Sequence, residues 1–115
     1  MTGQDRQESK TKKILRAGRL EVDLDRFEAQ WDGKPIVLTI TEFGLIRTLL
    51  GYPGKVFTRD ELISAAYTYD NIVTDRTIDS HVRRVRRKFA KVGADPIETV
   101  HGLGYRLGHT EKASE

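Results

Sequence analysis

One stretch of the sequence decides the fold: Arg76-Thr77-Ile78-Asp79-Ser80-His81-Val82-Arg83-Arg84-Val85-Arg86-Arg87-Lys88-Phe89-Ala90-Lys91. Its apolar residues recur at steps of four, three and four, which is the spacing of one narrow helix face. They are Ile78, Val82, Val85 and Phe89. The stretch holds seven basic residues but a single acid, Asp79. An apolar stripe beneath outward-facing arginines is typical of a helix that enters the major groove of DNA.

The opposite side of this helix is polar and basic. It carries Arg76, Ser80, Arg83, Arg84, Arg87 and Lys91. An ordinary surface helix with a solvated basic face would give the same pattern, and the scarcity of acids is what favours a polyanion partner. The whole chain has a net charge of only +3, so the remainder is net acidic. This segregation of charge favours one localised polyanion-binding face.

Composition limits the other possibilities. At 115 residues the chain is expected to form one domain, and 37% hydrophobic with 32% charged residues suits a folded protein. The absence of cysteine excludes disulfides, thiolate metal sites and a cysteine nucleophile. No apolar run reaches membrane-spanning length and no signal-peptide pattern opens the chain. These features predict a cytoplasmic protein without membrane contact.

The first third of the chain alternates like a small antiparallel sheet. Leu20, Val22 and Leu24 share one face, and Phe27, Ala29 and Trp31 share another after a turn at Asp25-Arg26. Asp32-Gly33 is a strong hairpin signal before a further short strand at 35–38. We assign residues 1–18 to a disordered arm or linker, with order beginning near Ile14, and 108–115 to a flexible tail. The folded domain is therefore expected over residues 19–107.

Two capping boxes predict two helices after this sheet. Thr39 and Glu42 begin a helix that runs to about Gly51, and Thr58 and Glu61 begin one that runs to Ala66 or Tyr67. Each start has an apolar pair placed for a hydrophobic staple, Leu38 with Phe43 and Phe57 with Leu62. The first helix is expected to bury Phe43, Ile46, Leu49 and Leu50.

The basic helix is expected over residues 75–90, and 93–96 end it. Strands at 97–100 and 105–107 then form a hairpin around His101-Gly102-Leu103-Gly104, whose glycines allow a tight tip. The order of sheet, helix, helix, loop, basic helix and hairpin predicts an α+β fold. Specifically, it predicts a winged helix-turn-helix with an N-terminal antiparallel sheet, three helices and a C-terminal β-hairpin wing.

Together these motifs resemble the C-terminal, DNA-binding effector domain of OmpR/PhoB-type two-component response regulators. The matching segments are Leu38-Thr39, Thr41-Glu42-Phe43, Thr58–Leu62, Asp75–Arg86 and Thr99–Arg106. The resemblance implies a four-stranded N-terminal sheet and transcription-factor activity. It also implies binding of two copies to direct-repeat half-sites of double-stranded DNA. An upstream receiver domain and a sensor kinase are the partners it implies for a longer protein. No receiver module fits in the first 18 residues, so we expect either a fragment or a standalone effector.

The resemblance also assigns roles to single residues. It places Arg83, Arg84 and Arg86 near bases or phosphates of the major groove, and Ser80 near base edges. It places Arg76 and Thr77 on phosphates, and Thr99 and Tyr105 in the wing near the DNA backbone. His101 stands where some members carry an arginine that reaches the minor groove. Arg87, on the outward face, and His81, as a packing or phosphate-contact residue, complete the expected DNA-binding set.

The loop before the basic helix matches the segment through which some members of that family touch RNA polymerase. It comprises Tyr67, Thr68, Tyr69, Asp70, Asn71, Ile72, Val73, Thr74 and Asp75. Tyr67 stands in place of a frequent tryptophan.

Three other classes of function fit the sequence less well. An enzyme is disfavoured because the adjacent acids Asp60 and Glu61 are explained by a solvated surface and a capping box. His101 and His109 have no suitably spaced acid or cysteine, so no metal or other cofactor is expected. A winged helix that binds an acidic protein remains an alternative, and competition by heparin or DNA would discriminate it. RNA is disfavoured, because the basic helix carries no exposed aromatic residue for stacking on bases.

Overall fold

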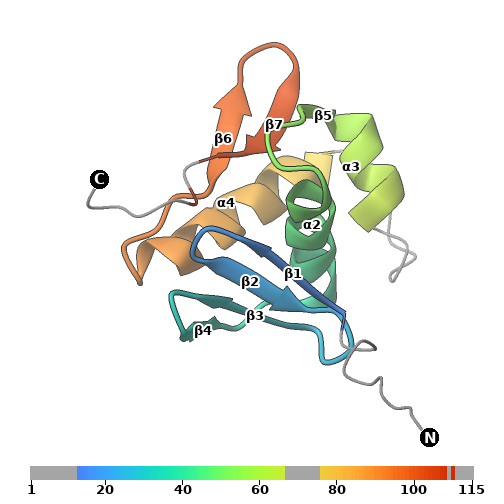
Figure 1. The fold of residues 1–115 in the computed structure, drawn as a ribbon. Helices are drawn as coiled ribbons and strands as arrows, with labels where there is room; N and C mark the ends of the chain where they lie inside the picture. Colours follow the sequence, from blue (N-terminus) through green and yellow to red (C-terminus); the bar gives the residue numbers. More distant parts are fainter. Residues whose placement is uncertain (1–12, 67–75, 109, 111–115) are drawn as a thin grey trace, which may run out of the picture.

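The computed structural model describes residues 13–66, 76–108 and 110, and it has seven strands and three helices there. In chain order these are β1 (Ile14–Ala17), β2 (Leu20–Asp23), β3 (Glu28–Trp31), β4 (Lys34–Ile36), α2 (Ile40–Gly51), β5 (Phe57–Thr58), α3 (Arg59–Ala66), α4 (Arg76–Ala90), β6 (Ile97–Val100) and β7 (Gly104–Leu107). Helix α2 stands between the N-terminal sheet and the β6–β7 hairpin (Figure 1). This is the predicted winged helix-turn-helix. In the described part of the chain, no helix has the length and apolar character needed to cross a membrane.

The N-terminal sheet is a four-stranded antiparallel meander in the order β1-β2-β3-β4. Its hairpin at Asp32-Gly33 is confirmed, because both residues have positive φ (53° and 83°) and Trp31 pairs with Lys34 across it. Two such residues in a two-residue loop are the mark of a type I′ turn, whose twist suits a hairpin. The sheet buries one face against the helices, with Leu20, Val22, Ala29, Trp31 and Ile36 in the core.

The described fold extends beyond residues 19–107 at both ends, and at its start it begins near Ile14, where order was expected to begin. Strand β1 lies inside the segment 1–18 that was assigned to an arm, and it pairs along its whole length with β2. Gly18, with a φ of 56°, makes the tight turn between them, and backbone pairing compensates for the weak apolar pattern of β1. Beyond the expected end at 107, Thr110 is buried and its carbonyl accepts the Arg19 N–H at 2.7 Å. Residues 1–12, 109 and 111–115 lie outside the described part.

Both capping boxes form as predicted. At α2 the Glu42 N–H donates to Thr39 Oγ1, and Glu42 Oε1 accepts the Thr39 N–H at 3.0 Å. At α3 Thr58 and Glu61 exchange the same two bonds. Each pair satisfies backbone donors that a helix start leaves free. The side chains expected to be buried in α2 are buried, and Leu45 joins them.

Helix α4 is attached to the core by its apolar stripe and by one ion pair. Ile78, Val82, Val85 and Phe89 are all buried, as predicted, and the Phe89 ring meets Trp31 edge to face at 6.1 Å. Lys88 Nζ also contacts Glu42 Oε1 at 2.5 Å, and Glu42 is only 1% exposed. Glu42 therefore both caps α2 and ties it to the end of α4.

The wing belongs to a second, three-stranded sheet in the order β5-β7-β6. Strand β5 was not foreseen, since Phe57 and Thr58 were assigned only to the start of the following helix. Phe57 pairs with Tyr105 and Thr58 with Gly104. A Cβ atom on Gly104 would lie 2.0 Å from the Phe57 carbonyl oxygen. Glycine is therefore what allows the wing to pair with β5.

The buried stripe of α4 leads to a stability prediction. We expect Phe89→Ala to lower the free energy of unfolding by about 3–5 kcal/mol, because it leaves a cavity between α4 and the sheet. Small domains are stable by only about 5–15 kcal/mol, so the loss should be conspicuous in urea denaturation. Arg87→Ala, on the exposed side of the same helix, is the control and should change stability by less than about 0.5 kcal/mol. An unchanged midpoint for Phe89→Ala would show that the ring contributes little to the core.

Candidate nucleic-acid interface

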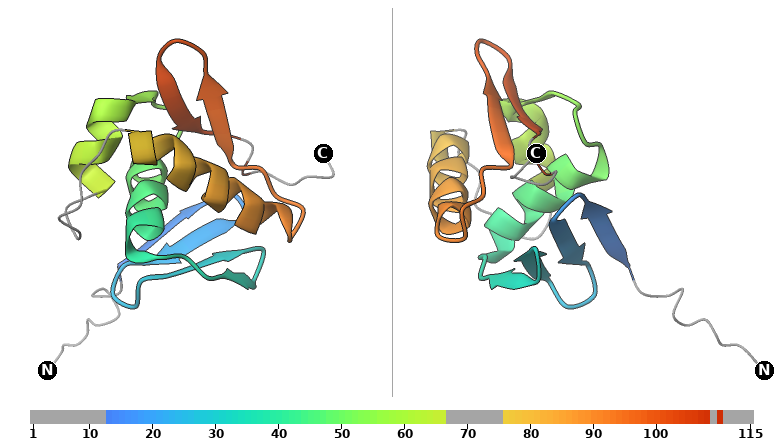
Figure 2. Two further views of the ribbon diagram at one scale, coloured as in Figure 1. Left: turned by 180° about the vertical axis from the view of Figure 1, so that it is seen from behind. Right: turned by 60° about the vertical axis from the view of Figure 1, so that its left-hand side comes forward.

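The outward side of α4 presents a row of arginines. Arg83, Arg84 and Arg87 are exposed, whereas Ser80 and His81 are half-buried beside the apolar stripe. The helix lies on the outside of the molecule, with α2 behind it and the wing beside it (Figure 2). Because the opposite side of α4 is fully packed, these guanidinium groups are held on a fixed support. Arg76 and Thr77 lie in the first turn of α4, but their side chains are outside what the structure describes.

Arg86 joins α4 to the wing instead of pointing freely outward. Its Nη2 donates to the Ile97 carbonyl at 2.9 Å and to Thr99 Oγ1 at 2.7 Å. The guanidinium also lies 6.0 Å from the centre of the Tyr105 ring. Thr99 accepts this bond, so its own hydroxyl proton stays available to another acceptor.

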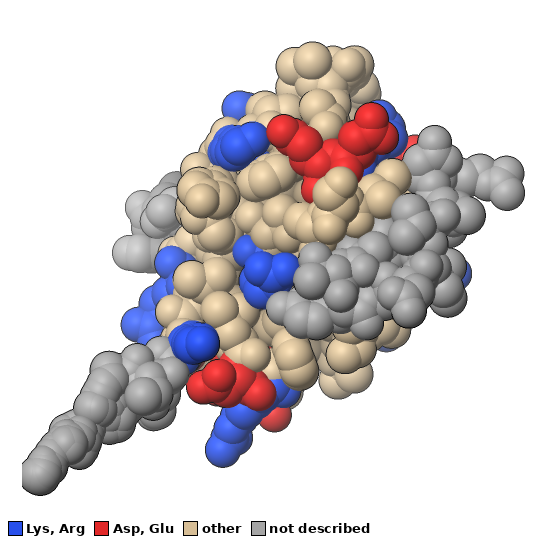
Figure 3. All heavy atoms as spheres, turned by 90° about the vertical axis from the view of Figure 1, so that its right-hand side faces the viewer, with Lys and Arg blue, Asp and Glu red and all other residues tan. Residues whose placement is uncertain are grey.

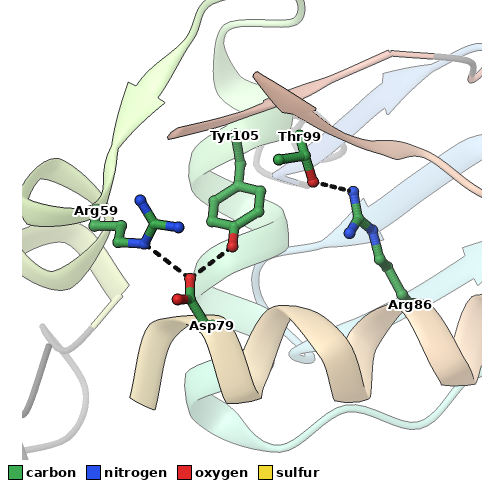
Figure 4. A network of polar contacts seen from close by, with 5 residues as sticks. All are labelled: Arg59, Asp79, Arg86, Thr99 and Tyr105. Atoms are coloured by element: carbon green, nitrogen blue, oxygen red, sulfur yellow. Dashed lines mark hydrogen bonds and ion pairs between the residues drawn. The ribbon is translucent and has the colours of Figure 1, made fainter. Parts of the chain in front are cut away.

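A second polar link joins α3, α4 and the wing at Asp79 (Figure 4). Asp79 Oδ1 accepts from the Tyr105 hydroxyl at 2.6 Å and from Arg59 Nε at 2.9 Å. The Tyr105 bond, followed by the Arg59 ion pair, lowers the pKa of the Asp79 carboxyl below its ordinary value against an opposing effect of burial. Burial, and then the bond to Asp79, raises the pKa of Tyr105. Tyr105 is thus a buried donor that keeps its hydroxyl proton and directs it at Asp79.

The tip of the wing carries no Lys, Arg, Asp or Glu side chain. His101 and Leu103 are exposed there, and the Leu103 N–H closes the turn on the Val100 carbonyl at 2.9 Å. Figure 3 shows this end of the molecule without Lys, Arg, Asp or Glu, above a mixed patch of acidic and basic side chains. On β7, Arg106 pairs with Glu98 of β6 at 2.9 Å, which raises the pKa of Arg106. The charge of Arg106 is therefore paired within the hairpin.

The structure thus groups the predicted site residues into two sets. Ser80, His81, Arg83, Arg84 and Arg87 form the outward surface of α4, and Arg86, Thr99 and Tyr105 form contacts between that helix and the wing, with His101 at the tip. Sequence reasoning missed Arg59 and the structural use of Asp79. A lone acid in an otherwise basic helix was the available signal. The predicted polymerase loop, 67–75, lies outside the described residues. Among those that are described, no group of acids and histidines is able to hold a metal ion.

Comparison with known proteins agrees with this geometry. Residues 33–107 match the family described as "Transcriptional regulatory protein, C terminal". The chain belongs to this family. Within it, the chain is 47% identical over 89 residues to the transcriptional regulatory protein BaeR of Escherichia coli O6:H1, a match that covers 76% of this chain and 37% of BaeR. It is 42% identical over 94 residues to the transcriptional regulatory protein CseB of Streptomyces coelicolor, covering 82% of this chain and 39% of CseB. The chain spans well under half the length of these curated relatives.

Solved structures of the family share the fold. The DNA-binding domain of the response regulator AdeR, solved in complex with an intercistronic region, matches with a TM-score of 0.72 and 33% identity over 82% of this chain and 97% of that one. The DNA-binding domain of CpxR from E. coli matches with a TM-score of 0.67 and 32% identity over 83% of this chain and 95% of that one. The chain therefore shares the winged-helix fold of response-regulator DNA-binding domains.

The lowered pKa of Asp79 predicts how stability depends on pH. A carboxyl whose pKa is lower in the folded than in the unfolded state stabilises the fold above its unfolded pKa, near 3.9, and this contribution is lost as the pH falls through the folded pKa. Asp79→Asn should therefore lower the urea midpoint at pH 7, and its deficit against the unmodified protein should shrink below about pH 4. Tyr105→Phe, which removes the principal hydrogen bond to Asp79, should show a smaller deficit with the same trend. A deficit that is constant from pH 7 to pH 3 would contradict the assignment.

Proposed function

We propose that this chain is the DNA-binding effector domain of a two-component transcriptional regulator and binds double-stranded DNA with sequence preference. The observation that carries the proposal is the row of exposed arginines on a helix whose other side is completely buried. Rigid presentation of guanidinium groups suits bidentate recognition of guanine in the major groove. The solved complex of AdeR with DNA supports this use of the fold.

Within α4 we assign base readout and phosphate contact to different residues. Arg83 and Arg84 read bases, and Ser80 reaches a base edge beside them. Arg76, Thr77, His81 and Arg87 hold phosphates on either side of the groove. Phosphate contacts fix the position of the protein on the duplex, whereas base contacts supply the sequence preference.

The wing rests on the sugar-phosphate backbone next to the groove that α4 occupies. Thr99 donates its hydroxyl proton to a phosphate, because the Thr99 oxygen already accepts from Arg86. Gly102, with a φ of 79°, lets the backbone at the tip approach the DNA closely, and His101 lies towards the minor groove. Arg86 and Tyr105 act mainly by orienting the wing.

The partners follow from membership of this family and from the length of the relatives. Since this chain covers 37% of BaeR and 39% of CseB, we place it in a longer regulator with a receiver domain that a sensor kinase controls. Two copies bind direct-repeat half-sites, and segment 67–75 contacts RNA polymerase. The protein acts in the cytoplasm, without enzymatic activity, cofactor or membrane contact. Binding-site selection from random duplexes tests the proposal, and failure to enrich any sequence would contradict it.

Arg84 provides the sharpest test of base readout. Arg84→Ala should weaken binding to the selected site by about 1–3 kcal/mol and flatten the preference at one or two positions. The control Arg76→Ala should weaken all sequences similarly and reduce the salt slope by about one. Fluorescence anisotropy on selected and random duplexes measures both. Equal losses on the two duplexes for Arg84→Ala would move this residue to the phosphate-contact set.

The direct-repeat arrangement predicts a dependence on helical phase. Two half-sites about one helical turn apart place two copies on the same side of the duplex. Inserting about five base pairs between them turns one copy to the opposite side and should remove any gain in affinity of the second copy. Inserting about ten should restore the phase and serves as the control. Gel-shift titration measures how many copies are bound. If the affinity for the second copy is the same with and without the five-base-pair insertion, the two copies do not contact each other.

A further inference from the structure

Asp79 is the one acid of α4, and it lies in the first turn of that helix among the proposed DNA contacts. An unpaired acid at such a place would repel DNA phosphates. Figure 4 shows Asp79 pointing towards both Arg59 and Tyr105, which come from α3 and β7. One carboxylate oxygen accepts from both, at 2.9 Å and 2.6 Å. Asp79 therefore connects the three elements that border the proposed interface.

The bond to Tyr105 excludes a competing role for this tyrosine. A tyrosine hydroxyl has one proton to donate, and a DNA phosphate can only accept. While Tyr105 donates to Asp79, it cannot donate to a phosphate as well. Tyr105 is also only 6% exposed. Its hydroxyl is thus used to hold β7 against the start of α4, which fixes the position of the wing relative to the recognition helix.

The bond to Arg59 changes the charge that the interface offers to DNA. Arg59 is exposed, and its guanidinium lies 5.5 Å from the centre of the Tyr105 ring, next to the foot of the wing. Paired with Asp79, the two groups together carry no net charge. Non-specific affinity for DNA depends on the number of cations that displace counterions. Asp79 therefore removes one cation from the set that attracts every sequence equally.

We propose that Asp79 determines specificity without touching a base, by fixing the wing through Tyr105 and by neutralising Arg59. The inference rests on the proposed function, DNA binding by α4 and the wing. Its two effects act on different complexes. The fixed wing supports the selected site, where helix and wing must fit together, and the neutralised arginine weakens binding to all other DNA. Asp79 is thus a positioning residue that widens the ratio of specific to non-specific affinity.

The variant Asp79→Asn tests both effects, since asparagine has nearly the same shape but no charge. On random duplex DNA, it should bind more tightly than the unmodified protein at low salt. Its plot of log affinity against log salt should steepen by about one unit, because Arg59 becomes available to a phosphate. The ratio of selected-site to random affinity should fall about tenfold, comparable to the effect of one wrong base pair. An unchanged salt slope, or an unchanged ratio, would overturn the proposal.

Matched variants separate these effects from general damage. Asp60→Asn removes the same charge from a neighbouring exposed position on α3 and should leave the ratio unchanged. Arg59→Gln should leave the salt slope on random DNA unchanged in the unmodified protein, but should reverse the steepening in the Asp79→Asn background. A purely structural role for Asp79 would not produce this dependence on background. A ratio that falls equally in Asp60→Asn would assign the effect to charge alone and overturn the positioning role.

Tyr105→Phe keeps the proposal testable if Asp79→Asn does not fold, which circular dichroism would reveal. This variant retains the ion pair and the ring, so the ratio should fall while the salt slope stays as in the unmodified protein. An unchanged ratio for a folded Tyr105→Phe would overturn the positioning role. The unmodified protein distinguishes the two levels of inference. If it prefers no sequence, the proposed function itself fails, whereas a clear preference that Asp79→Asn retains fails this inference alone.

Discussion

Burial of one side of α4 is the constraint on which the rest of the structure depends. Three of its apolar side chains, Ile78, Val85 and Phe89, have no exposed surface at all. Burying a large apolar side chain stabilises a fold by about 1.5–3 kcal/mol, so this contact can anchor a helix whose remaining residues are mostly charged. A helix of this length and composition would be only marginally stable alone in water. The same packing decides which arginines face outward.

Polar contacts then set the orientation of the elements that surround α4. The Lys88–Glu42 pair holds its last turns against the start of α2, and the Arg86–Thr99 bond holds its middle against β6. The Glu42 carboxylate is almost fully buried and accepts both a cap bond and the lysine, so its desolvation is compensated by two donors. Apolar burial is not directional, whereas hydrogen bonds are. These links therefore supply the angles that packing alone leaves open.

The parts of this fold that could be predicted from sequence are those encoded by nearby residues. Three features lie within a single helix or turn and were predicted correctly: the apolar stripe of α4, the two capping boxes and the Asp32-Gly33 hairpin. Two other contacts join segments that are distant in the sequence: the pairing of β5 with β7 and the bond between Arg59 and Asp79. No local sequence pattern predicts either of them. Arg86 is an intermediate case. It lies four residues after Val82, so helical geometry puts it at the edge of the buried stripe, where a long side chain reaches the adjacent strand before solvent.

The β5–β7 pairing also has a consequence for how the chain folds. Phe57 and Tyr105 stand at opposite ends of the segment that contains α3 and α4, so their contact closes a long loop and bears its entropic cost. Contacts of this kind form late, after local helices and hairpins have reduced the number of open conformations. The β6–β7 hairpin can close early by itself, but it reaches its final position only when the helices between its partners are in place. An aligned wing is therefore the signature of a completely folded domain, and nascent or truncated chains that stop before β7 also leave the edge of β5 unpaired.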